Sequence, residues 1–284
     1  MRKISRTAYG SKLQTHLLLG LPFELITNST LNEKFQVQAG VKPKEATMPA
    51  LRYLCIGNGG HRFLTNADGI AYTDPHTHRA SDAASFNNIP FVMREVNEDL
   101  SITERRKYAL RVAETHNGVN YYAYYLKRLD IPTDTPVEMI YTTVRDGASQ
   151  STPFAPTTSN LNPKPPEIPS TGVVSTEGDY LSTSAIITIS FGASDVEELL
   201  NVARILYNNE NLAVISEFGL CTGVDQSVVG QASGGQQFNY LEALMVQLAM
   251  HVTDYYPVGF ANEGFEFKLQ VGKTEPLLQT SDGS

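Results

Sequence analysis

Apolar and polar residues alternate along two stretches of the chain, residues 184–191 and 265–271. Alternation of this kind predicts strands that bury one face and expose the other. A third strand is indicated by the compact apolar segment 51–56, which stops at Gly57-Asn58-Gly59-Gly60. Because glycine and asparagine favour tight turns, this strand is expected to end there.

Two further segments carry the side chains that strands favour. Residues 119–129 are rich in tyrosine, and residues 137–144 are rich in β-branched side chains. Asp146-Gly147, which follows them, supplies the positive φ that a hairpin turn needs. With a strand expected from Arg111 onward, these segments predict an antiparallel meander in the N-terminal half.

Two capping boxes predict helix starts, since a serine side chain accepts from a backbone amide while an acid reaches back. Ser101-Ile102-Thr103-Glu104 opens a short helix expected to end near Tyr108, and Ser194-Asp195-Val196-Glu197 opens one that ends at Asn208-Asn209. Residues 212–220 are expected to form a strand and residues 222–237 a loop. Helical spacing recurs over residues 240–253, at Leu241, Leu244, Met245, Leu248 and Val252. The C-terminal half is therefore predicted as strand, helix, strand, helix, strand.

Three stretches lack such periodicity. Residues 64–90 are rich in Asn, Asp, Thr and Pro and predict a long loop. Residues 153–172 predict a linker or strap, because its prolines remove backbone donors: Pro153, Pro156, Pro163, Pro165, Pro166 and Pro169. The first residues carry Arg2, Lys3, Arg6 and Lys12 without an acid, which is typical of an extended arm.

The predicted fold class is α+β. The predicted organisation has five consecutive segments: an extended arm (1–24), a β-rich region with long loops (25–152), a proline-rich linker (153–172), an α/β region (173–275) and a flexible tail (276–284).

Composition excludes several classes of protein. The chain has 284 residues, of which 41% are hydrophobic and 18% charged, which is typical of a folded globular protein. No apolar run approaches the ~20 residues that cross a bilayer, so no membrane is expected among its partners. The net charge of −8 argues against binding to nucleic acid. Cys55 and Cys221 are expected to be free buried thiols in a protein made in a reducing cytoplasm.

Asp74, His76 and His78 form the one candidate metal site. Residues two apart on an extended chain project to the same side and could chelate one cation. A structural zinc site needs four ligands, and only His61, Asp82 or His116 could complete the set. The alternative is a polar loop whose side chains hydrogen-bond to backbone amides. We expect no metal and no cofactor.

No catalytic residue is expected. The chain has no Gly-x-Ser-x-Gly elbow, and Gly57–Gly60 lacks the spacing of a nucleotide-binding loop because Arg62 stands where a glycine is needed. A glycosidase pair is defined by distance in space, and it could come from Glu95, Glu98, Asp99, Glu217 and Asp225. Glu217 lies in an apolar strand, where burial would raise its pKa, whereas an edge strand would expose it to water.

Four tyrosines, Tyr121, Tyr122, Tyr124 and Tyr125, place aromatic rings on both faces of one predicted strand. Tyrosine buries apolar area and keeps a hydroxyl for hydrogen bonds, so it is favoured at protein interfaces. We expect core on one face and partner contact on the other. The other interface candidates are Arg2, Lys3 and Arg6 in the arm and Pro163, Pro165 and Pro166 in the strap.

Several stretches resemble virion structural proteins of tailed bacteriophages with contractile tails. They are residues 57–63, Asp74-Pro75-His76-Thr77-His78-Arg79-Ala80-Ser81-Asp82-Ala83-Ala84, Ile89-Pro90-Phe91-Val92-Met93-Arg94-Glu95, Ser159-Asn160-Leu161-Asn162-Pro163 and residues 215–225. The resemblance spans about residues 50 to 275 and brings no catalytic motif.

The resemblance implies a non-enzymatic structural subunit, made in the host bacterial cytoplasm and located in the virion. Its expected partners are copies of itself in a ring, hexameric or a multiple of six, and other tail or neck proteins. The neck or tail-completion region is the favoured station, and the baseplate is the alternative. The alternative from another class is a tail-associated cell-wall hydrolase that uses paired carboxylates such as Glu95 and Glu217.

Overall fold

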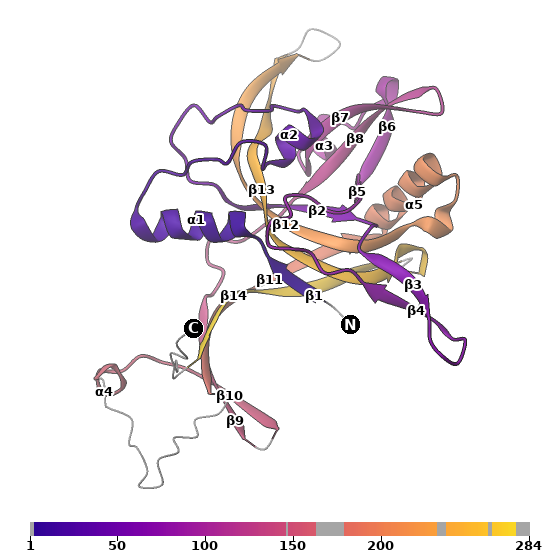
Figure 1. Cartoon of the computed structure of the whole chain (residues 1–284). Coiled ribbons are helices and arrows are strands. Elements are labelled where there is room, and N and C mark those ends of the chain that lie inside the picture. Colours follow the sequence, from indigo (N-terminus) through magenta and orange to yellow (C-terminus); the bar gives the residue numbers. More distant parts are fainter. Residues whose placement is uncertain (1–2, 146, 163–178, 232–236, 261–262, 277–284) are drawn as a thin grey trace. The chain divides into compact units, whose positions relative to one another are not determined.

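A computed structural model describes residues 3–145, 147–162, 179–231, 237–260 and 263–276 (Figure 1). The chain forms two compact units, each built from parts that are not consecutive in sequence. Unit 1 comprises Met1–Asp130 and Phe191–Phe265, and unit 2 comprises Ile131–Ser190 and Glu266–Ser284. The five consecutive segments expected from the sequence therefore do not correspond to the compact units.

Unit 1 is built on an eight-stranded, antiparallel sheet. Its main path runs in the order β1 (Lys3–Arg6), β13 (Gln237–Pro257), β12 (Val214–Gln231), β2 (Ala50–Gly57), β8 (Val119–Arg128) and β6 (Val92–Glu95). Two strands lie off this path: β5 (Asn88–Ile89) pairs with β2, and β7 (Tyr108–His116) pairs with β8. The strands expected at residues 51–56 and 119–129 are thus confirmed as β2 and β8.

Residues 240–253 form part of strand β13, so the predicted helix is wrong. Residues 243–248 are all buried, which means that both faces of the strand are covered. Such a strand has a continuous apolar run instead of alternation, and its periodicity does not separate it from a helix. The predicted loop at residues 222–237 is also wrong over its described part, because β12 continues to Gln231.

An irregularity in β13 is held by a side chain from the N-terminal part of the chain. Val224 pairs with Leu244 and Thr222 with Gln247, so the register shifts across Met245, whose φ is 57°. Asn32 donates from Nδ2 to the Ala243 carbonyl and accepts from the Val246 N–H, both at 2.9 Å. The amide side chain thereby replaces ladder hydrogen bonds that the bulge removes.

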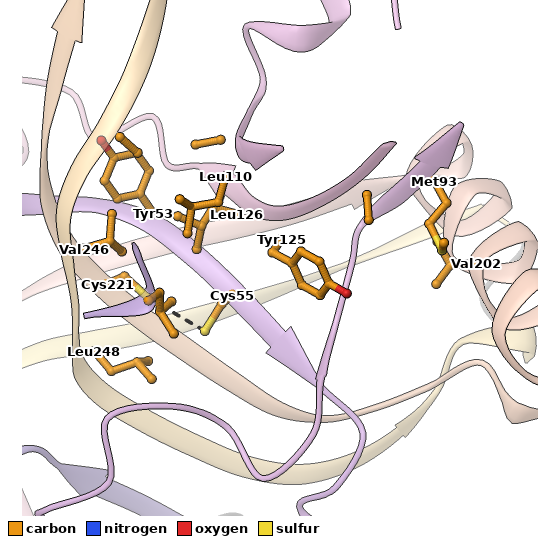
Figure 2. Packing of buried hydrophobic residues seen from close by; sticks show 14 residues of the cluster. Tyr53, Cys55, Met93, Leu110, Tyr125, Leu126, Val202, Cys221, Val246 and Leu248 are labelled. Atoms are coloured by element: carbon orange, nitrogen blue, oxygen red, sulfur yellow. Dashed lines mark hydrogen bonds between the residues drawn. The ribbon is translucent and has the colours of Figure 1, made fainter. Parts of the chain in front are cut away.

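The core of unit 1 lies between β2, β8, β12 and β13, with α2 (Leu31–Phe35) packed on it. Figure 2 shows Tyr53, Leu126 and Val246 converging with the two cysteines, whose sulfur atoms are 3.7 Å apart. Cys55 and Cys221 are free and buried, as expected. Burial raises the pKa of the Cys221 thiol, because a thiolate would lose its hydration there.

Residues 1–24 were expected to form an extended arm, and the described residues correct this. β1 pairs with β13 of the same chain, and α1 (Ala8–Leu19) follows it. Thr7 caps α1 by accepting from the Gly10 N–H and donates from its hydroxyl to the Leu248 carbonyl. Because the expectation rested only on four basic residues and the absence of acids, it did not reveal the cap or the pairing.

The expected long loop at 64–90 is also interrupted by structure. The hairpin of β3 (His61–Thr65) and β4 (Ala71–Pro75) forms its own two-stranded sheet. An Asx turn at Asn66 closes this hairpin, since its Oδ1 accepts from the N–H groups of Asp68 and Ile70.

Both helices predicted from capping boxes form, but only the first begins with the predicted capping box. α3 (Ile102–Arg105) has the predicted box, in which Ser101 Oγ accepts from the Glu104 N–H and Glu104 accepts from the Ser101 N–H. It ends earlier than expected because β7 begins at Tyr108. α5 (Ala193–Tyr207) starts after Gly192, whose N–H donates to Asp195, and it ends at Asn208 with φ 53° as expected. Short 3-10 helices are η1 (Val96–Glu98), η2 (Glu210–Leu212) and η3 (Val258–Phe260). Among the described helices, none is both long enough and apolar enough to cross a membrane.

Unit 2 contains a four-stranded sheet in the order β10-β9-β11-β14. Its strands are β9 (Glu138–Arg145), β10 (Ala148–Pro153), β11 (Tyr180–Gly192) and β14 (Gly264–Pro276), and α4 (Thr158–Leu161) follows β10. The strands predicted from alternation are confirmed as β11 and β14, where Ile187, Ile189 and Leu269 are buried.

The meander predicted for the N-terminal half is wrong, because β8 and β9 belong to different sheets. The fold remains α+β with mostly antiparallel sheets. Half of the proline-rich linker, residues 163–172, and all but one residue of the tail lie outside the described residues.

Candidate functional site

The end of α1 carries an exposed apolar surface, which we call the leucine surface. It consists of Leu17 (55% exposed), Leu18 (88%), Leu19 (64%), Leu21 (48%) and Ile26 (45%). Isolated apolar residues are common on protein surfaces, but a group of exposed apolar side chains in one segment is typical of an interaction site.

The start of α1 is fixed on the sheet while its end is not. Leu13 is the one buried residue of the helix, and a Cβ on Gly10 would lie 2.9 Å from the Ala249 carbonyl oxygen. The helix stops at Gly20, whose φ of 63° suits glycine and whose N–H caps the carbonyls of the last turn. The leucines that follow Leu13 are therefore held in place by the helix without being buried by it.

The basic interface candidates have mixed positions. Lys3 donates to the Pro75 carbonyl at 2.6 Å and lies 3.9 Å from Asp74, so its side chain serves the fold of its own chain. Arg6 is half-buried in β1. Arg2, Pro163, Pro165 and Pro166 lie outside the described residues.

The four tyrosines of β8 do not divide into a core face and a partner face. Tyr124 is 2% exposed and donates to Asp99, whereas Tyr125 is 8% exposed and donates to Glu114, both at 2.5 Å. Tyr121 and Tyr122 are half-buried. Burial and the nearby carboxylates raise the pKa of both Tyr124 and Tyr125. Tyr124 and Tyr125 are thus core residues and are corrected as interface candidates.

Asp74, His76 and His78 are not brought together as a metal site. Asp74 accepts from two nitrogens of Arg62, at 2.8 and 3.0 Å, and this pairing lowers its pKa. His78 lies 3.0 Å from Asp82 and 2.8 Å from Glu217, away from the Arg62 pair. Within the described ranges, no group of three or more His, Cys, Asp or Glu side chains is arranged to hold a metal ion.

Glu217 is instead the centre of a buried polar cluster. It is 0% exposed, and its carboxylate accepts from the backbone N–H groups of Gly59, Phe86 and Asn87 at 3.0, 2.8 and 3.3 Å. The remaining hydrogen-bond partner of the carboxylate is His78, whose Nε2 lies 2.8 Å from Glu217 Oε1. A buried charge that is fully hydrogen-bonded in this way is tolerated, because each lone pair keeps a partner. Glu217 therefore ties two loops to strand β12.

The glycines next to β2 make this approach possible. A Cβ on Gly57 would lie 2.5 Å from Glu217 Oε2, and one on Gly60 would lie 2.5 Å from the Glu217 Cγ and the Ser216 carbonyl oxygen. The Gly-Asn-Gly-Gly sequence thus serves close backbone approach to a buried carboxylate, in addition to the turn that was expected.

His251 completes the cluster from strand β13. Its ring stacks on that of His78, and its Nε2 lies 3.4 Å from the Asp82 carbonyl oxygen. Burial, reinforced by the neighbouring His78, lowers the pKa of His251 to about 4. Although burial acts to raise it, the pKa of Asp82 is lowered by hydrogen bonds from the Arg79 N–H and His78.

This geometry does not supply the carboxylate pair of the hydrolase hypothesis. Glu217 is inaccessible and fully engaged by backbone amides and His78, whereas Glu95 is exposed on β6. Asp99 and Asp225 are occupied by the ion pairs Arg111–Asp99 and Arg128–Asp225. None of these four carboxylates lines the cavity described next.

A cavity of about 260 Å³ lies where α3 and β7 meet the first residues of β13. Four arginines line it, Arg105, Arg106, Arg111 and Arg128, together with one acid, Glu242. Apolar side chains, including Ile102, Leu110 and Leu241, also line it. Sequence reasoning missed this site. The adjacent Arg105-Arg106 was a visible signal, but residues 238–243 were predicted to be largely helical and could not be placed opposite it.

The whole chain, residues 1–284, matches the model of one protein family, described as a family of unknown function (DUF7208). The chain belongs to this family. Its match extends over both units, including the leucine surface and the arginine-lined cavity. No curated protein and no solved structure matches the chain.

Proposed function

We propose that this protein is a non-enzymatic structural subunit of a tailed-bacteriophage virion, located in the neck or tail-completion region. In this proposal, copies of the chain associate into a ring, hexameric or a multiple of six, and the ring contacts other tail or neck proteins. The observation that carries the proposal is the leucine surface, because exposed leucines in a row are stabilised when another chain covers them. The kind of assembly that we propose, a ring in a phage virion, comes from the resemblance of the sequence to virion structural proteins.

Two features of unit 1 support the same interpretation. β1 stands at one end of the strand order, so its outer edge is unpaired among the described strands, and Ile4 on it is 60% exposed. An open edge with an apolar side chain is a template for pairing with another chain. The Glu217 carboxylate is buried and hydrogen-bonded to three backbone N–H groups and to His78, which suits a rigid scaffold better than a turnover site.

The size of the association energy can be bounded from the leucines. Burying one exposed leucine fully is worth about 1.5–3 kcal/mol. An interface that covers several of them, repeated at every subunit contact of a closed ring, would offset the entropy of association.

Mass photometry of the purified protein and cryo-electron microscopy of intact particles test the proposal. We expect a closed oligomer in solution and density for the chain at the neck, or at the baseplate if the alternative station is correct. A protein that stays monomeric at all concentrations and is absent from purified virions would contradict it.

A further inference from the structure

The arginine-lined cavity carries more positive charge than its own acids neutralise. Asp99 accepts from Arg111 at 2.6 Å and from the Tyr124 hydroxyl, while Arg105 lies 3.9 Å from the same carboxylate. One carboxylate therefore serves two guanidinium groups. The chain as a whole has 22 basic and 30 acidic residues, so this local excess runs against its composition.

The remaining charges leave Arg106 unbalanced. Arg128 is paired with Asp225, and Glu242 accepts from Gln38 and from the Tyr240 hydroxyl. In the part of the chain that the structure describes, no acidic side chain lies within 4 Å of the exposed Arg106. In addition, the Nε of Arg128 is buried and has no hydrogen-bond partner among the described residues.

Apolar groups flank these charges at the mouth of the cavity. Ile102 is 43% exposed and Leu241 is 47% exposed, and the Arg105 guanidinium lies over the Tyr240 ring at 5.8 Å. A ligand that fits both features has a carboxylate next to an aliphatic or aromatic group.

We propose that this cavity binds an acidic, leucine-rich peptide segment of a partner protein, with Arg105 and Arg106 holding its carboxylates and Ile102 and Leu241 contacting its apolar side chains. Planar guanidinium groups bind carboxylates through paired N–H donors, and clusters of them recognise acidic motifs. A nucleic acid fits less well, because the net charge of −8 repels a long polyanion. The site is separate from the leucine surface, and it does not depend on ring formation.

Fluorescence anisotropy of the full chain with a fluorescein-labelled peptide of alternating glutamate and leucine tests this proposal. We expect saturable binding to the wild type and a loss of at least about tenfold in affinity, equivalent to 1.4 kcal/mol, in Arg106→Glu and in Leu241→Lys. Both side chains are exposed, so both variants should melt like the wild type. Arg204→Glu, on the exposed face of α5, is the matched control and should bind the peptide normally.

Three further ligands test which chemical features the cavity recognises. The same peptide with glutamine in place of glutamate, free glutarate, and a single-stranded oligothymidine are tested at equal concentrations. Equal binding of the glutamine peptide, equal affinity for glutarate, tighter binding of the oligothymidine, or unchanged binding by Arg106→Glu would each overturn the proposal. If a Leu18→Lys variant loses self-association but still binds the peptide, then peptide binding does not depend on the proposed ring.

Discussion

The imidazole rings of His78 and His251 stack with their centroids 3.7 Å apart and their planes within 8°. His78 lies between Asp82 and Glu217, and the ring of Phe86 stacks on it at 4.1 Å. His251 is 1% exposed. A protonated His251 ring would be poorly hydrated at this buried position, which is why protonation of His251 opposes the fold.

Stability is expected to fall in mild acid. The pKa of His251 is about 4 in the folded protein and 6.5 in an exposed histidine, so the unfolded chain binds more protons between these values. Neutral His251 therefore contributes to the free energy of unfolding in full above pH 6.5. This contribution is lost as the pH falls toward 4, by roughly 3 kcal/mol in total. Urea unfolding at pH 7.5, 6 and 5 measures this slope. His251→Gln should flatten it, whereas His16→Gln in α1 should not, and an unchanged slope in His251→Gln would exclude His251 as its source.

Glu217→Gln is expected to destabilise unit 1 by about 1–3 kcal/mol, the cost of leaving a buried donor without an acceptor. The amide NH₂ would face at least one of the N–H donors of Gly59, Phe86 and Asn87. Thermal melting followed by circular dichroism gives the change. Glu197→Gln, exposed on α5, is the control and should melt like the wild type; equal melting of both variants would show that the cluster contributes little.

Leu18→Lys is expected to leave the fold intact and to weaken self-association. Leu18 is 88% exposed, so the free energy of unfolding should change by less than about 0.5 kcal/mol. If a second copy covers this side chain, losing its burial should raise the dissociation constant by about tenfold or more. Sedimentation equilibrium measures the constant. Gln14→Lys adds the same charge to an exposed position of the same helix, and an equal effect of both variants would assign the change to charge alone.

Thr7→Val is expected to cost about 1–2 kcal/mol, since it removes both a helix cap and a donor to strand β13. Thr15→Val, at an exposed position of α1, should cost less. Chemical denaturation compares the two variants.

Removal of residues 1–24 should lower the melting temperature further, because β1 and the Leu13 contact are lost with the cap. A truncated protein that melts like the full chain would return this segment to the role of an arm.

Where a strand buries one face, its position could be predicted from sequence. β11 and β14 have alternating side chains, and both were located from that pattern alone. β13 could not be located, because Leu244 and Val246 are both fully buried on opposite sides of the sheet. Its irregularity at Met245 depends on Asn32, more than two hundred residues away, so no local pattern records it.

The candidate sites were predictable only where they are local in sequence. Glu217 was recognised as a carboxylate in an apolar strand, and the glycines after β2 were recognised as a turn, but their contact depends on the pairing of β2 with β12. The interface potential of Tyr124 and Tyr125 was overestimated, since the acids that bind their hydroxyl groups come from outside their own strand. The leucines from Leu17 to Leu21 were visible from the start, but only the structure gives their exposure.

Pairing of β1 with β13 also constrains the order of events during synthesis. Thr7 and Leu248 are 241 residues apart, so the ribosome has made most of the polypeptide before this hydrogen bond can form. Until then residues 3–6 and Leu13 of α1 remain without the neighbours that they have in the folded unit, at the time when aggregation competes with folding. Folding with so many long-range contacts is expected to be slow for a chain of this size, and dependence on chaperones would follow from that delay.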